Sequence, residues 1–123
     1  MENVKTHLVT GGCGFVGRNM VKRLLNTTQD QVVFIDNLMV GTHPDTWLTH
    51  ETAVRGEDYV VYDSRALFIH DDALKVMRRL MDNPQHFADD FPFDCDRIAD
   101  VFHFAAIVGG RAKIDGDPMM VAL

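Results

Sequence analysis

The chain has 123 residues, of which 46% are hydrophobic and 24% charged, a composition typical of one globular domain with its own core. Its net charge of −6 and the absence of any basic run argue against nucleic acid as a partner. No apolar run approaches the roughly 20 residues of a membrane span, the N-terminus does not resemble a signal peptide, and the two cysteines form no Cys-x-x-Cys pair. We therefore expect a cytoplasmic protein that has no membrane partner.

A glycine-rich turn joins the first predicted strand to the first predicted helix. The apolar run at residues 6–10 predicts a buried parallel strand, and the spacing of apolar positions predicts a helix over residues 15–26. Between them Gly11, Gly14 and Gly17 recur every three residues. In a dinucleotide site the first glycine permits a tight turn, the second lets a pyrophosphate approach the backbone, and the third brings helix and strand together.

The N–H groups of Phe15 and Val16, at the start of the predicted helix, would face the phosphates, because a helix N-terminus attracts anions.

An acidic residue follows the second predicted strand. The second strand is predicted at residues 31–35, and Asp36 follows it, 19 residues after Gly17. A carboxylate at this position can accept both hydroxyls of an adenosine ribose and repels a 2′-phosphate, so it favours NAD over NADP. The alternative is a glycine-rich turn in an unrelated α/β protein.

These two stretches resemble a known family. Residues 10–17, Thr-Gly-Gly-Cys-Gly-Phe-Val-Gly, and residues 35–38, Ile-Asp-Asn-Leu, are similar to the extended short-chain dehydrogenase/reductases, specifically the NAD-dependent sugar-nucleotide epimerases and dehydratases. The resemblance implies an α/β fold with a Rossmann-type doubly wound parallel sheet in a single NAD(P)-binding domain over residues 1–123. It covers only the N-terminal half of such a protein, so we expect the sheet to be truncated after about four strands, in the order 3-2-1-4.

The loop after Asp36 supplies two further candidates. Residues 36–49 contain turn-forming residues and are predicted to be a loop. In the family this loop wraps the adenosine, so the resemblance makes Asn37 and Gly41 candidate cofactor contacts. The alternative for Asn37 is a simple turn residue.

The third strand is predicted at residues 57–62, with Asp63 and Ser64 at its carboxyl end. Ligands of open α/β sheets bind beyond the carboxyl ends of the strands. In the family, an Asp and a small or apolar residue at this place contact the adenine. The resemblance therefore assigns Asp63 and Ser64 to adenine binding. The alternative is a helix N-cap, because both residue types cap well.

A helix is predicted over residues 71–81, followed by an irregular stretch at residues 83–96. Prolines and acids in that stretch predict a surface loop, and a short helical turn within it is the alternative. The interval from Asp63 to His103 is 40 residues, about twice what the family implies, so the stretch is interpreted as an insertion. Its acids are read as a solvated face, with a partner-docking surface as the alternative.

The fourth strand is predicted within residues 97–105 and carries a third match to the family. His103-Phe104-Ala105-Ala106 is similar to the family's His-Leu-Ala-Ala, with Phe in place of Leu. The resemblance places Phe104, Ala105 and Ala106 beside the cofactor, where small side chains let the backbone pass close to it. His103 is interpreted as a hydrogen-bonded core residue and not as a catalytic base.

The last segment contributes one candidate for the substrate. In the family the loop holding Arg111 faces the sugar, so Arg111 is a candidate contact for a sugar-nucleotide phosphate, with a solvent-exposed Arg as the alternative. The family's catalytic pair is Tyr-x-x-x-Lys, but Tyr59 and Tyr62 are followed four residues later by Asp63 and Ala66. No catalytic residue and no metal ligand is therefore assigned.

The sequence favours one function and leaves two alternatives. It predicts the NAD-binding part of a nucleotide-sugar epimerase/dehydratase-like oxidoreductase that acts through a transient keto-sugar, with a nucleotide sugar as partner if the catalytic segment is supplied. The first alternative is a non-catalytic module that binds NAD or a nucleotide sugar, and the second is a remnant that binds neither. The exposed edge of the fourth strand is expected to promote association into an oligomer.

Overall fold

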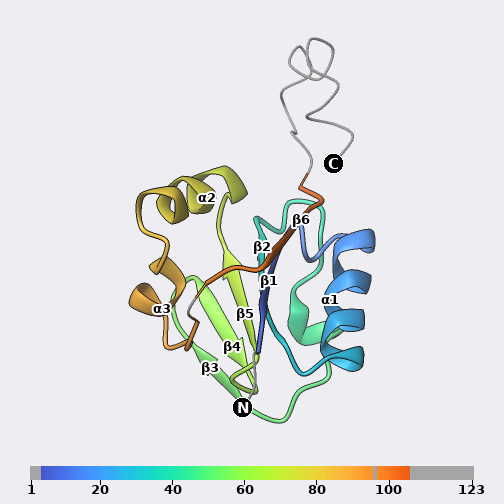
Figure 1. Ribbon diagram of the computed structural model, residues 1–123. Coiled ribbons are helices and arrows are strands. Elements are labelled where there is room, and N and C mark those ends of the chain that lie inside the picture. Colours follow the sequence, from blue (N-terminus) through green and yellow to red (C-terminus); the bar gives the residue numbers. More distant parts are fainter. Residues whose placement is uncertain (1–3, 96, 106–123) are drawn as a thin grey trace.

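The computed structural model describes residues 4–95 and 97–105 and shows one twisted sheet between two layers (Figure 1). The strand order is β3-β4-β5-β2-β1-β6. Helix α1 covers one face of the sheet, and α2 and α3 cover the other. The α/β class and the Rossmann-type arrangement predicted from the sequence are confirmed.

Four parallel strands form the centre of the sheet. They are β1 (Thr6–Thr10), β2 (Gln31–Asp36), β5 (Ala66–His70) and β6 (Asp100–His103). Their spatial order is β5-β2-β1-β6, which is the predicted 3-2-1-4 order of a doubly wound sheet. Two short antiparallel strands, β3 (Ala53–Arg55) and β4 (Tyr59–Tyr62), extend the sheet beyond β5.

Helices α1 (Phe15–Thr27) and α2 (Ala73–Asp82) begin and end close to the predicted positions. The 3-10 turn η1 (Pro44–Thr46) lies in a segment predicted to be a loop, and α3 (His86–Asp90) is a short helix within the stretch predicted to be a surface loop. The side chain of Asp72 caps α2 by accepting a hydrogen bond from the N–H of Lys75. None of the helices in the described part of the chain has the length and apolar character needed to cross a membrane.

Alternating residues of the strands build two cores. On β2, Val33 and Ile35 face α2 and α3, whereas Val32 and Phe34 face α1, and all four are fully buried. A strand that is buried on both faces must be apolar at every position, which explains its uninterrupted hydrophobic run.

The prediction for the third parallel strand was wrong. Residues 59–62 do form a strand, but β4 runs antiparallel to β5, and β5 is the strand that pairs in parallel with β2. Asp63 and Ser64 form the two-residue turn between β4 and β5, with φ values of +54° and +59°. Two consecutive positive φ values are typical of the type I′ turn, whose twist matches that of a hairpin.

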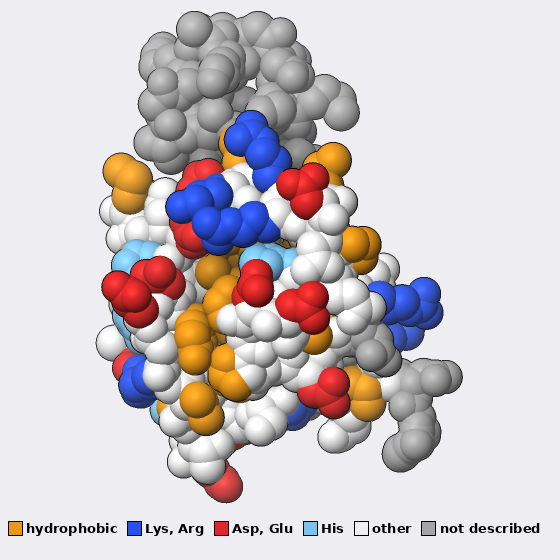
Figure 2. Space-filling view, turned by 90° about the vertical axis from the view of Figure 1, so that its left-hand side faces the viewer, with side chains coloured by type: hydrophobic (Ala, Val, Ile, Leu, Met, Phe, Trp, Pro, Cys, Tyr) orange, Lys and Arg blue, Asp and Glu red, His pale blue; other side chains and the backbone are white. Residues whose placement is uncertain are grey.

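The segment 83–96 is more than a surface loop. Because the third parallel strand ends at His70, the interval to His103 is 33 residues rather than 40. Phe87 and Phe93 from this segment are buried in the core against the sheet. On the outside of this face, acidic and basic side chains surround a strip of hydrophobic ones (Figure 2). The acids Asp89, Asp90 and Asp94 are exposed, as a solvated face requires.

Candidate functional site

The glycine turn lies at the edge of the sheet where the four parallel strands end. The N–H groups of Gly11 and Gly12 both donate to the carbonyl of Ile35, at 2.8 and 3.2 Å. These bonds tie the turn to the end of β2. The carboxyl ends of β1 and β2 therefore meet in one place, which is where open α/β sheets bind ligands.

Two of the three glycines are required by the packing of the protein itself. Gly11 has φ +68°, and a Cβ atom there would lie 2.7 Å from the N atom of Ala105. A Cβ atom on Gly17 would overlap the carbonyl oxygen of Gly11. Both positions therefore exclude side chains, for the reasons predicted from the sequence: a left-handed turn and a close approach of helix to strand.

Gly14 is different, because the protein leaves space around it. A Cβ atom on Gly14 would find only the Gly11 carbonyl oxygen, at 3.6 Å, which is an ordinary contact. Its φ and ψ of −76° and 176° suit any residue. Nothing in the described part of the chain explains the lack of a side chain here, whereas a ligand that approaches the backbone would.

The start of α1 offers free N–H groups beside Gly14. Gly14 is the N-cap residue, no side chain caps the helix, and its first turn contains no acidic residue. The first helical N–H with an intrahelical acceptor belongs to Arg18, which donates to the Gly14 carbonyl. The N–H groups of Phe15 and Val16 have no acceptor within residues 4–95 and 97–105, so they are available to an anion.

Asp36 is held over the glycine turn. Its Oδ2 atom accepts the N–H of Cys13 at 2.9 Å, and its Oδ1 atom accepts the N–H of Leu38 at 2.7 Å. The residue is half-buried, and each carboxylate oxygen has a second lone pair for a ligand hydroxyl. Burial and the neighbouring Asp36 carboxylate raise the pKa of the Cys13 thiol, so this cysteine stays protonated and unreactive at neutral pH.

The loop after Asp36 packs against the glycine turn. A Cβ atom on Gly41 would lie 2.8 Å from the carbonyl oxygen of Cys13, and the N–H of Thr42 donates to that oxygen. Packing therefore accounts for Gly41 without a ligand. Asn37 is exposed, and its side chain accepts the N–H of Met39 in a local turn.

Thr10 was not identified from the sequence, although it connects β6 to the glycine turn. Its buried hydroxyl accepts the N–H groups of Phe104 and Ala105, at 3.1 and 3.3 Å, and lies 2.5 Å from His103 Nδ1. The Phe104 N–H also donates to the Thr10 carbonyl, at 2.9 Å. A polar residue at the end of an otherwise apolar run was the available signal. His103 is thus hydrogen-bonded, as predicted, but it is half-buried and not in the core.

Asp63 and Ser64 lie where the parallel strands begin, at the opposite end of these strands from the glycine turn. Because β4 runs antiparallel, its end pairs beside Ala66, at the start of β5. The Asp63 carboxylate accepts the N–H groups of Thr52 and Glu51, at 2.7 and 3.0 Å. The adenine assignment rested on a parallel strand, so it no longer follows, and neither residue is the helix N-cap considered as the alternative.

The true third parallel strand ends at His70, and Asp71 follows it. His70 pairs in register with Asp36, and the N–H of Asp71 donates to the Asp36 carbonyl at 3.2 Å. Phe104 and Ala105 are half-buried at the end of β6, on the same edge. Ala106 and Arg111 lie outside the described residues.

Known proteins resemble this chain in sequence and in fold. A family model described as the NAD dependent epimerase/dehydratase family matches residues 7–118. The dTDP-glucose 4,6-dehydratase 1 of Escherichia coli K12 and the dTDP-glucose 4,6-dehydratase of Shigella flexneri are each 55% identical over 31 residues. That match spans 25% of this chain and 9% of each dehydratase.

A solved structure has a similar fold. The UDP-glucose 4-epimerase of Thermotoga maritima, crystallised with UDP-glucose, superposes with a TM-score of 0.51 at 24% identity. The superposition covers 95% of this chain and 29% of the epimerase. The chain thus spans less than a third of the length of the proteins it matches.

Proposed function

The chain belongs to the NAD dependent epimerase/dehydratase family, and from this we propose that it forms the NAD-binding part of a nucleotide-sugar epimerase or dehydratase. The observation that carries the proposal is the open backbone at Gly14 beside the uncapped start of α1. A pyrophosphate there would meet free N–H groups and the positive end of the helix dipole.

The residues present fit a dinucleotide. Gly14 and the N–H groups of Phe15 and Val16 would hold the pyrophosphate, and Asp36 would accept the ribose hydroxyls. Phe104 and Ala105, held by Thr10, would flank the ribose nearer the nicotinamide. NAD, when bound, supplies a hydride acceptor, which in this family serves to oxidise a sugar hydroxyl to a transient ketone.

Asp36 favours NAD over NADP. Its two oxygens already accept N–H groups from Cys13 and Leu38, which fix the orientation of the carboxylate. A fixed negative charge at the ribose would repel a 2′-phosphate. The carboxyl end of β5 suggests that His70 and Asp71, rather than Asp63 and Ser64, lie near the adenine.

The proposal of a nucleotide-sugar substrate rests on the family and on the names of the similar dehydratases and epimerase. Arg111 remains a proposed contact for a phosphate of that substrate. A binding module without catalysis would use the same NAD site, so cofactor binding is the property to test first, and turnover distinguishes the two.

The test is calorimetric titration of the whole chain with NAD and with NADP, repeated on Asp36→Asn. Asn keeps one acceptor oxygen and loses the charge, so we expect NAD binding to weaken by about 1.5–3 kcal/mol, the scale of a hydrogen bond to a charged group. We also expect the preference for NAD over NADP to shrink. Thermal unfolding of both proteins controls for folding. A folded chain that binds neither nucleotide would contradict the proposal.

A further inference from the structure

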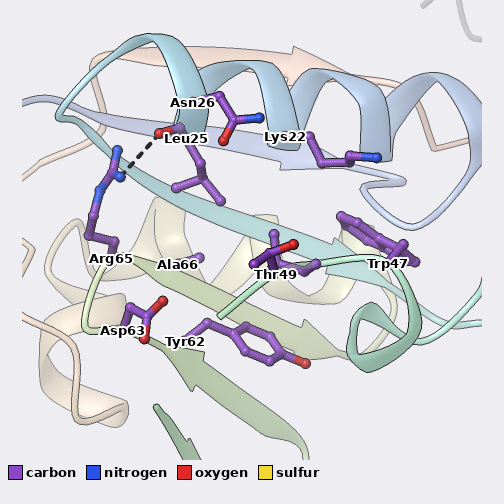
Figure 3. A pocket seen from close by; sticks show the side chains of 10 residues that line it. Lys22, Leu25, Asn26, Trp47, Thr49, Tyr62, Asp63, Arg65 and Ala66 are labelled. Carbon is purple, nitrogen blue, oxygen red and sulfur yellow. Dashed lines mark hydrogen bonds between the residues drawn. The ribbon is translucent and has the colours of Figure 1, made fainter. Parts of the chain in front are cut away.

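A cavity lies on the side of the sheet away from the glycine turn, where the parallel strands begin. Its volume is about 150 Å³, and it opens between the second half of α1, residues 47–49, and the start of β5 (Figure 3). The hairpin turn containing Asp63 lines one end of it. This is the amino edge of the parallel strands, so the cavity is separate from the proposed NAD site.

A loop between β2 and β4 forms one wall of the cavity. Between β2 and β4 the chain forms only the short turn η1 and the strand β3 on its way to the hairpin. Trp47 and Leu48 pack this loop onto the sheet: the Trp47 ring lies 5.9 Å from the Phe34 ring, and Leu48 is buried. The indole N–H donates to the Thr42 carbonyl, which fixes the ring at the cavity wall.

Several polar groups that line the cavity are already occupied. The Arg65 guanidinium donates to the carbonyls of Leu25, Thr28 and Asp30, where it closes the end of α1. The Tyr62 hydroxyl donates to Asp45 at 2.8 Å. The Asp63 carboxylate accepts backbone N–H groups, as described above. These bonds fix the positions of the three groups in the cavity wall.

Three other polar side chains are unused. Within residues 4–95 and 97–105, the side chains of Lys22, Asn26 and Thr49 make no hydrogen bond or ion pair, although all three line the cavity. Lys22 is half-buried and its ammonium group lies toward Trp47, at the opposite end from Asp63 (Figure 3). Leu25 and Ala66 contribute apolar surface to the lining.

We propose that this cavity binds a small monocarboxylate whose body is a single six-membered ring. A cavity of about 150 Å³ holds one benzene-sized ring. The ring would contact Trp47 and Leu25, and the carboxylate would pair with Lys22 and accept hydrogen bonds from Asn26 and Thr49. The lining holds two cations, Lys22 and Arg65, and one carboxylate, Asp63, so the charges sum to +1, which suits a monoanion better than a phosphate or a dianion.

Trp47 is the single tryptophan of the chain and lies in the wall of the cavity, so its fluorescence reports on the site. We expect benzoate to change this fluorescence saturably, and benzyl alcohol, which lacks the charge, to bind at least tenfold more weakly. Amide NMR shifts on the native chain should be confined to residues 22–26, 47–49 and 62–66. NAD should not compete, since its proposed site lies at the other edge.

Lys22→Met should weaken benzoate binding tenfold or more. The matched control is Arg23→Met, which removes one positive charge from the same helix at an exposed position that does not line the cavity, and it should leave binding unchanged. Benzoate shifts that map to residues 11–17, equal binding of benzyl alcohol, or no saturable change on the native chain would each overturn the proposal. Equal loss in Arg23→Met would show only general charge attraction and would also overturn it.

Discussion

At the scale of the residue, the three glycines of the turn lack a side chain for different physical reasons. Gly11 and Gly17 lie where a side chain would collide with the protein's own backbone, whereas Gly14 faces open space. Glycine spacing alone could not separate these cases, because the spacing is the same. Only the neighbours of each Cα atom show that Gly14 is the position to test for a ligand.

Gly14→Ala is therefore predicted to separate folding from binding. Alanine restricts the unfolded chain, which stabilises by about 0.4–1 kcal/mol, but it is a poorer N-cap than glycine by a similar amount. We expect the free energy of unfolding to change by less than about 1 kcal/mol, and NAD affinity to fall tenfold or more because the methyl group blocks the pyrophosphate. Urea unfolding and calorimetry measure the two effects.

The control for this prediction is Gly17→Ala. Its methyl group would overlap the Gly11 carbonyl, so it should lower stability by several kilocalories per mole, as overpacking does. If Gly14→Ala destabilised the chain as much as Gly17→Ala, the space seen at Gly14 would have a structural function, and the assignment to the pyrophosphate would be wrong.

At the scale of the element, the hairpin of β4 and β5 decides which strand takes the third parallel position in the sheet. The type I′ turn at Asp63 and Ser64 reverses the chain, so β5 supplies the third parallel strand. The Asp63 carboxylate also accepts the N–H groups of Thr52 and Glu51, which connects the start of β3 to this turn. One side chain thus connects the residues before β3 to the hairpin turn.

These bonds predict a specific pH dependence. The hydrogen bond from the Thr52 N–H lowers the pKa of Asp63 below its usual value. A depressed folded-state pKa contributes stability above the unfolded pKa of about 3.9, and this contribution is lost as the pH falls through the folded value. Asp63→Asn, which tolerates a positive φ, should therefore be less stable than the native chain at pH 7. Below about pH 3 the difference should close.

Thermal unfolding of the two proteins between pH 7 and pH 2.5 tests this. The turn is exposed, so the difference at pH 7 should be modest. Glu57→Gln, an exposed carboxylate that makes no hydrogen bond through its side chain within the described residues, is the matched control and should show no such closing gap. A constant difference for Asp63→Asn at all pH values would mean that the charge of the carboxylate does not matter.

At the scale of the whole molecule, β6 forms one edge of the sheet. Among the described strands it pairs only with β1, and Val101 on it is 50% exposed. An apolar edge strand with unpaired backbone groups favours pairing with another chain. Association through this edge is still a prediction.

We expect the chain to self-associate in sedimentation experiments, and Val101→Lys to shift it toward monomer, because a charge on an edge strand opposes pairing. Val40→Lys adds the same charge at an exposed loop position and should have little effect. A native chain that sediments as a single monomer at all concentrations, or equal effects of both substitutions, would contradict the prediction.

The sequence alone determined what depends on local chemistry. Glycines after an apolar run and an acid after the next one predicted the turn, α1, β2 and Asp36, because each is decided by residues close together in the chain. The 3-2-1-4 order of the parallel strands also followed from the resemblance and is confirmed.

Only the tertiary structure decided what depends on pairing between distant segments. A β-rich run such as residues 57–62 is the same sequence whether it pairs parallel or antiparallel, so Asp63 and Ser64 were placed at the wrong edge. Thr10 and the cavity beside Trp47 likewise depend on contacts between segments far apart in sequence. The direction of a strand is set by its partner, and that partner is chosen only when the sheet assembles.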